Sequence, residues 1–306
     1  MRMKLSYEAL KREISEHKGS FAVYLLLRGF VVLTLILQLL NGNFENVFLC
    51  LLTLLLLILP AAVQVEFHIE LPTLLEVILL VFIFCAEILG EINAFYERIP
   101  LWDTLLHTVN GFVAAAIGFS LVDLMNRSER ISFSLSPLFA VLVAFCVSMT
   151  IGVMWEFFEF FMDQVFQLDM QKDTVIQSFS TVVLDPSHGN TPIRLEDIRD
   201  VAVNGTSLGL GGYLDIGLID TMKDLIVNFI GAAVFSVTGF FYVKSRGGKR
   251  TAAQGFVPAP KTAEQDYLRQ ARERAGGPEG PGGAEKPDRP KKPGRKHGGG
   301  RKGETG

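Results

Sequence analysis

Six long apolar runs dominate this 306-residue sequence, each close to the ~20 residues with which a helix crosses the hydrocarbon core of a bilayer. They are Phe21–Leu40, Val47–Val63, Leu74–Leu89, Leu105–Val122, Pro137–Phe158 and Leu225–Tyr242. A large helical soluble core is the alternative, but the stretch LLTLLLLILPAAV has no polar face to present to water. We therefore predict an all-α, polytopic transmembrane helical bundle of about six spans in residues 21–243.

The two ends of the chain are polar. Residues 1–20 are basic and precede a first apolar run longer than the 7–15 residues of a cleavable signal peptide, so we predict a cytoplasmic lead and an uncleaved anchor. Residues 244–306 carry 16 Lys and Arg against 7 Asp and Glu and are rich in Gly and Pro. Such a composition buries little apolar surface, so we expect a disordered basic cytoplasmic tail; the segment AEQDYLRQARERA could form a short helix.

Basic residues indicate the orientation of the chain in the membrane. They concentrate in the lead, in NRSER at 126–130 and in KSRGGKR at 244–250, whereas residues 1–243 have a net charge of -12. The positive-inside rule places these three segments in the cytoplasm and the loops 41–46, 90–104 and about 164–219 outside. We expect a multi-pass protein of a bacterial cell membrane with both termini cytoplasmic. The long outer loop is expected to be a lid, part strand and part helix.

The cysteines and the basic tail narrow the classes of partner. Cys50, Cys85 and Cys146 lie inside apolar runs without metal-binding spacing, which favours small hydrophobic packing roles and predicts no disulfide framework. No aromatic residue follows Tyr267 in the basic tail, so stacking on bases has no support and we expect no nucleic-acid partner. Membrane lipids are the expected partners, and protein partners are not specified by the sequence.

Acidic residues gather at the ends of four apolar runs that face the same, outer side. In WEFFEFFMDQ, residues 155–164, three carboxylates fall within an arc of about 60° on a helix. The other runs contribute acidic, His and Asn residues at helical spacing. The full set is Glu87 and Glu91; Asp103, His107 and Asn110; Glu156, Glu159 and Asp163; Asp220, Asp224 and Asn228.

Helix capping explains only part of this set. Asp103 and Asp220 stand at helix starts, where the dipole favours negative charge, but Glu156 and Glu159 stand near a helix end, where it does not. Shared protons or a cation would neutralise them. Carboxylates with one imidazole suit Mg²⁺, Mn²⁺ or Ca²⁺, or Zn²⁺ bound with His107. The metal-ligand candidates are Asp103, His107, Glu156, Glu159, Asp220 and Asp224, supported by Glu87, Glu91, Asn110, Asp163 and Asn228. A polar path and purely structural interhelical hydrogen bonds remain alternatives.

Three segments carry a family resemblance: FYERIPLWDTLLHTVNGFVAAAIGF, GVMWEFFEFFMD and DIGLIDTMKDLIVNFIGA. In them the chain resembles the YjdF-like family of bacterial integral membrane proteins and, more distantly, VanZ-type proteins associated with glycopeptide resistance. The family motifs map to Asp103 and His107, to Glu156 and Glu159, and to Asp220, Asp224, Asn228 and Gly231. The resemblance covers roughly residues 20–245 and implies a membrane fold, but it carries no established activity to this chain.

Three functional hypotheses follow from these observations. The first is a metal-assisted enzyme acting on a lipid or envelope precursor, with His107 or Glu156 as the catalytic base. The second is an ion-binding or transport module, which should have a polar track through the bilayer. The third is a structural membrane protein whose polar groups only hold the bundle together.

Overall fold

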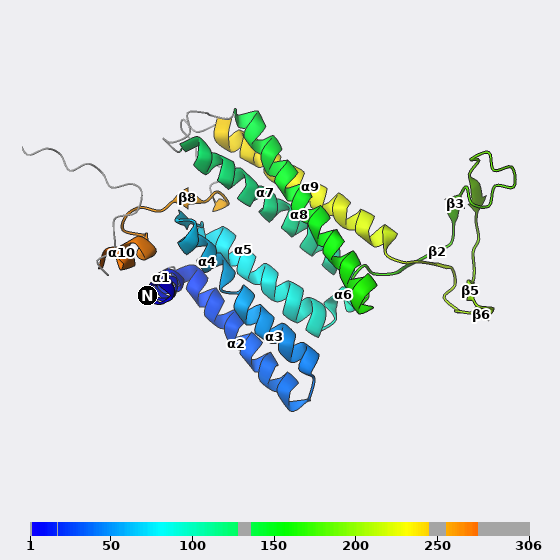
Figure 1. Ribbon diagram of the computed structural model, residues 1–306, viewed down its shortest axis with the longest axis horizontal. Coiled ribbons are helices and arrows are strands. Elements are labelled where there is room, and N and C mark those ends of the chain that lie inside the picture. Colours follow the sequence, from blue (N-terminus) through cyan, green and yellow to red (C-terminus); the bar gives the residue numbers. More distant parts are fainter. Residues whose placement is uncertain (1, 17, 128–135, 245–254, 275–306) are drawn as a thin grey trace, which may run out of the picture.

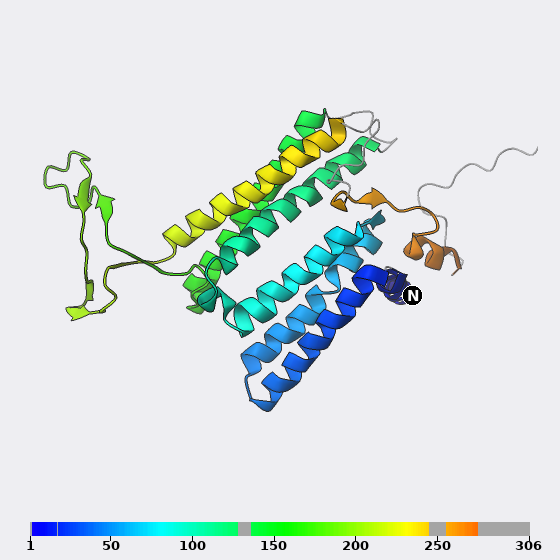
Figure 2. The same cartoon turned by 180° about the vertical axis from the view of Figure 1, so that it is seen from behind.

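In the computed structural model, which describes residues 2–16, 18–127, 136–244 and 255–274, helices run side by side as a bundle (Figures 1 and 2). Six helical segments are long and apolar enough to cross a membrane, as predicted. They are Gly19–Leu40, Phe44–Glu66, Thr73–Ile92, Trp102–Asp123, Pro137–Phe166 and Leu218–Tyr242. The last four extend beyond the predicted apolar runs because their acidic ends are helical too, so the candidate site residues lie on helices rather than in loops.

The first three spans form one half of the bundle. It consists of α2 (Lys18–Leu40), α3 (Phe44–Leu56), α4 (Leu59–Glu66), α5 (Thr73–Phe84) and the π-helix η1 (Cys85–Ile92). Pro60 stands in the first turn of α4, where a helix does not use the backbone N–H that proline lacks. The second span therefore divides into α3 and α4 at this proline. The short α6 (Phe95–Arg98) links this half to the next.

The last three spans form the second and more tightly packed half. It consists of α7 (Trp102–Arg127), α8 (Pro137–Phe166) and α9 (Leu218–Lys244), whose mutual contacts are the most extensive in the molecule. Glycines permit the close approach of α7 and α9: a Cβ at Gly111 would lie 2.1 Å from the Asn228 carbonyl oxygen, and one at Gly231 would lie 2.0 Å from that of Thr108. Contacts between the two halves are sparse.

Between α8 and α9 the chain leaves the bundle as an extended arm, residues 167–217 (Figure 1). Its antiparallel strand pairs are β2 (Thr174–Ile176) with β7 (Tyr213–Asp215), β3 (Phe179–Thr181) with β4 (Ile193–Leu195), and β5 (Ala202–Val203) with β6 (Thr206–Ser207). The expected lid of strand and helix is therefore wrong in two respects. The described arm contains no helix, and it projects away from the bundle instead of covering its end (Figure 2).

At the opposite end, α1 (Arg2–Glu16) and the described segment 255–274 pack against the first half. Helix α1 contacts α10 (Tyr267–Arg274), and β8 (Ala259–Pro260) pairs with β1 (Ile69–Glu70). We call α1, β1, β8 and α10 the terminal clasp. The expected disorder of residues 244–306 does not hold for residues 255–274, although the helix suggested near AEQDYLRQARERA is present. The rest of that tail, and the NRSER segment beyond Arg127, lie outside the described residues.

A buried ion pair joins this polar segment to α1. Lys261 pairs with Glu13 of α1, and both side chains are almost fully buried. Asp266 Oδ2 lies 2.9 Å from His68 Nδ1, within hydrogen-bond distance, and Leu268 packs with Ala9 and Val65. The few apolar contacts of this segment are thus supplemented by an ion pair. A lysine buried here without Glu13 would carry an uncompensated charge, which is strongly destabilising.

Candidate functional site

The centre of the candidate site is His107, on the second turn of α7. Its side chain is 8% exposed. Its Nε2 lies 3.4 Å from Asp103 Oδ1, one turn earlier on the same helix, and 3.8 Å from Asp224 Oδ2 on α9. Its Nδ1 lies 3.9 Å from Glu156 Oε1 on α8. Both ring nitrogens therefore face carboxylates, and three helices meet at one imidazole.

Helix α8 contributes Glu156 and Glu159, which are 5% and 7% exposed. Glu159 Oε1 accepts a hydrogen bond from Trp155 Nε1 at 2.8 Å. Glu156 Oε2 is buried and has no hydrogen-bond partner among the described residues. A buried carboxylate oxygen without a donor is costly, and native proteins rarely leave one unless an ion, a water molecule or a substrate satisfies it.

The start of α9 supplies Asp220 and Asp224. Asp224 is 2% exposed and faces the cluster, whereas Asp220 Oδ2 accepts the Lys172 backbone N–H at 2.8 Å. Asp163 also binds the base of the arm, because its two oxygens accept the N–H groups of Met170 and Gln171. Of the predicted site residues, Asp163 and one oxygen of Asp220 thus anchor the arm to the bundle.

Below the carboxylates an amide network connects the three helices. Asn110 Nδ2 donates to Asn228 Oδ1 at 3.4 Å, and Asn228 Nδ2 approaches the Ser148 carbonyl oxygen at 3.4 Å. Ser148 Oγ in turn donates to the Gly111 carbonyl oxygen at 2.7 Å. Asn228 is fully buried. These bonds fix the relative depth of α7, α8 and α9 and so position the carboxylates above them.

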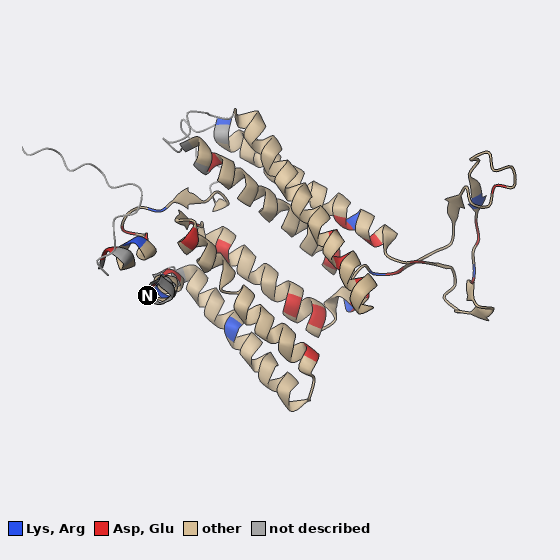
Figure 3. Ribbon diagram, in the orientation of Figure 1, with Lys and Arg blue, Asp and Glu red and all other residues tan. Residues whose placement is uncertain are grey.

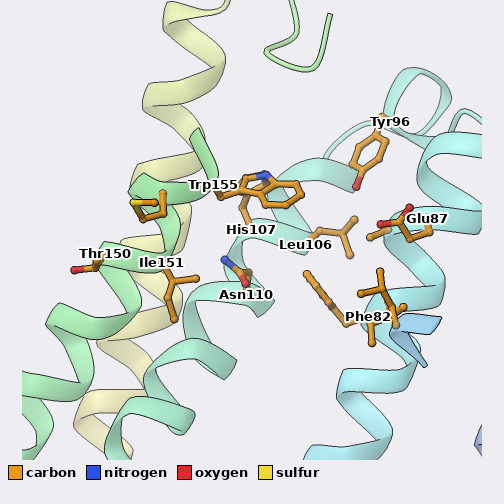
Figure 4. Close-up of a pocket in the computed structure, with 13 residues that line it drawn as sticks. Phe82, Glu87, Tyr96, Leu106, His107, Asn110, Thr150, Ile151 and Trp155 are labelled. Atoms are coloured by element: carbon orange, nitrogen blue, oxygen red, sulfur yellow. The ribbon is translucent and has the colours of Figure 1, made fainter. Parts of the chain in front are cut away.

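A cavity of about 470 Å³ opens beside the cluster, between the two halves of the bundle (Figure 4). His107, Asn110 and Trp155 line one side, and Glu87 lies across from them with Tyr96. Glu87 therefore does not join the carboxylates around His107, because it lies on η1 across the cavity; Glu91 is on the same π-helix but is not part of the cavity lining. A π-helical turn is rare and often marks a functional site. Burial, with the nearby charge of Glu91, raises the pKa of the Tyr96 phenol well above its ordinary value.

Negative charge is in excess at this end of the bundle (Figure 3). Among the described residues, the ion pairs of the cluster's carboxylates all run to His107. Lys172, at the base of the arm, pairs with Glu97 at 3.3 Å and donates to the Asp169 carbonyl oxygen. One imidazole cannot balance Asp103, Glu156, Glu159 and Asp224, so protons or a cation must supply the remaining positive charge.

Three of the predicted ligands have the spacing of a metal site. One ligand atom each from Asp103, His107 and Asp224 lies within 4.8 Å of the other two. Two carboxylate oxygens and an imidazole nitrogen suit Zn²⁺ or Mn²⁺, and Mg²⁺ if water completes the shell. Glu156 is adjacent through His107, while Glu159 is held by Trp155. The geometry thus divides the six predicted ligands into a core of three and a surrounding group.

Comparison with known proteins identifies the family. The model of the family described as Predicted membrane protein (DUF2238) matches residues 22–245. The chain belongs to this family. The match spans nearly all six helical segments and the whole site, and it is consistent with the YjdF-like resemblance. The chain is a multi-pass membrane protein.

One relative of this chain is an uncharacterized protein from Thermotoga maritima. It is 31% identical over 98 residues, which cover 32% of this chain and 48% of that protein. The chain therefore aligns with about half the length of this relative. No solved structure matches the chain.

Two aromatic residues on the cavity wall were not among the predicted site residues. Trp155 donates a hydrogen bond to Glu159 and lines the cavity. Tyr96 had no assigned role. Its position depends on Gly90, where a Cβ would lie 2.4 Å from the Tyr96 ring. The sequence signal available was the adjacency of Trp155 to Glu156 and of Tyr96 to the helix start that carries Asp103.

Proposed function

We propose that this protein is a metal-dependent membrane enzyme that acts on a lipid or envelope precursor. The observation that carries the proposal is the convergence of Asp103, His107 and Asp224 beside the unsatisfied Glu156 Oε2. A divalent cation at the three ligands would polarise a phosphoryl or acyl oxygen of the substrate or activate water.

The roles of the side chains follow from their positions. Asp103 and Asp224 are the carboxylate ligands and His107 the nitrogen ligand. Glu156 is the catalytic base because its free oxygen is buried next to the ligands and is available to accept a proton. Glu159, which accepts the hydrogen bond of Trp155, is a further carboxyl group beside the site. His107 is a ligand and not the base in this assignment, because both of its nitrogens face carboxylates.

The position of the site in the bundle supports a membrane-embedded substrate. The cluster lies at the end from which the arm projects, within helices that are long enough to span a bilayer. By the positive-inside rule this end is the outer face of a bacterial cell membrane and the terminal clasp is cytoplasmic. A lipid headgroup lies at this depth.

A transport role has less support from the packing. A continuous path would have to pass the centre of the second half, where Ala115, Phe119 and Phe235 are fully buried in one apolar cluster. Among the described residues of α7, the buried polar side chains that follow His107 are Ser120 and Asp123. The polar groups thus form separate clusters and not a track.

Metal analysis of the purified protein, beside an assay on membrane lipids, tests the proposal. Wild-type protein should hold one divalent ion per chain, and Asp224→Asn and His107→Ala should lose it while remaining folded. The matched control is Asp169→Asn, an exposed carboxylate in the arm. With extracted bacterial lipids, metal-dependent products detected by mass spectrometry should disappear in Glu156→Gln although the ion is retained. The absence of metal from wild-type protein, with unchanged melting of all variants, would leave a structural role in its place.

A further inference from the structure

The cavity beside His107 has two chemically different parts. Its walls are mainly apolar and include Leu56, Phe82, Ile83, Leu106, Ile151 and Met154. The hydroxyl of Thr150, which also lines it, is already bonded to the Cys146 carbonyl oxygen. Polar groups that can meet a ligand gather at the end formed by His107, Glu87 and Tyr96 (Figure 4).

The cavity opens toward the bilayer along α8. Ile151, Met154 and Trp155 line it and are 40%, 59% and 42% exposed on the surface of a membrane-spanning helix. The two halves of the bundle touch only sparsely, so no packed helix closes this side. A hydrocarbon chain can therefore enter the cavity directly from the membrane, whereas a water-soluble substrate would first have to enter the hydrocarbon region.

The volume is sufficient for one hydrocarbon chain. A water molecule occupies about 30 Å³ of liquid and a methylene group is of similar size, so a cavity of about 470 Å³ has room for roughly fifteen such groups. Apolar surroundings also favour a chain over a polar ligand, because each buried methylene group adds to the affinity.

The charge at the polar end selects the headgroup. Carboxylates around His107 repel an anion when no cation is bound, whereas a divalent cation there attracts a phosphoryl oxygen. The raised pKa of Tyr96 keeps its phenol neutral, so it can donate a hydrogen bond to an oxygen at the same end.

We propose that this cavity binds one hydrocarbon chain of a membrane lipid whose phosphate ester lies at Asp103, His107 and Asp224. The inference rests on the proposed function for the headgroup, and on the cavity alone for the chain. A phospholipid, with its second chain left in the bilayer, and a single-chain isoprenoid or alkyl phosphate share this chemistry.

Photo-cross-linking in lipid nanodiscs tests the proposal. The full chain is labelled with an alkyl phosphate that carries a diazirine on its chain, and the modified residues are mapped by mass spectrometry. Label should concentrate on α5 and α8 at the cavity wall. Ile83→Trp and Ile151→Trp, which fill the cavity, should reduce it more than about tenfold, since each displaced methylene group is worth roughly fourfold in affinity. The matched control is Ile226→Trp on α9, exposed and outside the cavity wall, which should leave labelling unchanged.

Competition experiments distinguish a single-chain phosphate from a phospholipid as the ligand, and metal analysis of the labelled protein distinguishes failure of the cavity proposal from failure of the metal site. An excess of unlabelled single-chain alkyl phosphate or of diacyl phosphatidic acid identifies the source by which of them removes the label. Equal competition by the uncharged alkyl alcohol would overturn the phosphate assignment. Label spread evenly over the lipid-facing surface, with metal bound, would overturn the cavity proposal and leave the metal site standing. Label in the cavity of a protein that binds no metal would overturn the metal site and leave the binding of a hydrocarbon chain standing.

Discussion

Two buried polar clusters lie at opposite ends of the bundle, and they balance their charge differently. In the terminal clasp one glutamate, Glu13, meets one lysine, Lys261. At the arm end several carboxylates surround the single imidazole of His107. A pair of one acid and one base balances its own charge. An unbalanced cluster is incomplete without an additional positive charge, and this difference is the physical ground for assigning function to one end only.

The largest expected effect is on the balanced pair. Glu13→Gln leaves a buried ammonium without its counter-ion, which costs about 3–5 kcal/mol in comparable buried pairs. Because the clasp is a peripheral part of the fold, we expect the loss as faster hydrogen exchange in residues 2–16 and 255–274, with the spans unaffected. The control is Glu196→Gln in the exposed pair with Arg194, worth roughly 0–1 kcal/mol. Recovery in a Glu13→Gln, Lys261→Met double variant would support this reason, and unchanged exchange in Glu13→Gln would refute it.

The second effect concerns how the arm-end cluster is held. Gly111→Ala places a methyl group against the Asn228 carbonyl oxygen, so α7 and α9 must separate. We expect a loss of about 1–3 kcal/mol in the free energy of unfolding, as in other overpacked sites. Metal affinity should fall as well, because His107 moves away from Asp224. The matched control is Gly29→Ala on α2, where a Cβ meets no atom within 4 Å. Thermal unfolding and metal titration check both, and equal behaviour of the two variants would contradict the close contact.

These two regions also differ in how far the sequence predicted them. The arm-end cluster was predictable because helical periodicity places Asp103 with His107, and Asp220 with Asp224, on single faces, and because an alternating topology brings the helix ends to one side. The clasp was not, because β1 and β8 are two-residue strands about 190 positions apart along the chain. A lone lysine in a Gly- and Pro-rich tail gives no periodic signal of its buried partner.

Other features depend on packing that no local pattern reports. The sequence CAEILGEI suits an α-helix, and its π-helical bonding arises where Gly90 lets Tyr96 pack against it. The β-branched residues of the arm predicted strands correctly, but nothing in them indicates that the arm would project rather than fold back. The direction of the arm depends on anchors at its base, including the bonds of Asp163 and Asp220 to backbone N–H groups.

The third prediction is a gain in stability from the substitution of a buried glutamate, where the first was a loss. Glu156→Gln is the same chemical change as Glu13→Gln, but it removes charge from a cluster that has too much. With a chelator present we expect the free energy of unfolding to rise by roughly 0.5–2 kcal/mol, a typical gain from charge optimisation. With divalent cation added, the wild type should gain more stability than the variant. Melting curves of both proteins, with and without cation, check this. A decrease in the chelated variant would mean that Glu156 is already satisfied within the fold.

The smallest effect tests a carboxylate that needs no cation at all. Asp185 in the arm accepts hydrogen bonds from the backbone N–H groups of Ser187, Gly189 and Thr191 and from the Ser187 hydroxyl. These donors, the Ser187 hydroxyl first, lower its pKa to about 2. Because this value lies below the ordinary pKa near 4, the stabilisation of the turn is present above about pH 4 and is lost as the pH falls toward 2. Asp173 in the same arm, whose pKa is raised by partial desolvation and by Asp169, should be protonated before Asp185 as the pH falls.

Carboxyl chemical shifts in an acid titration measure both groups, and Asp185→Asn should increase the exchange of the Gly189 and Thr191 amides without changing the spans. If Asp185 titrated together with Asp173, backbone donors alone would not suffice to hold its charge. The contrast with Glu156 depends on this point. A carboxylate that is supplied with donors by its own turn needs nothing from outside, whereas one with an oxygen buried among other acids and left without a donor calls for a proton, a cation or a substrate.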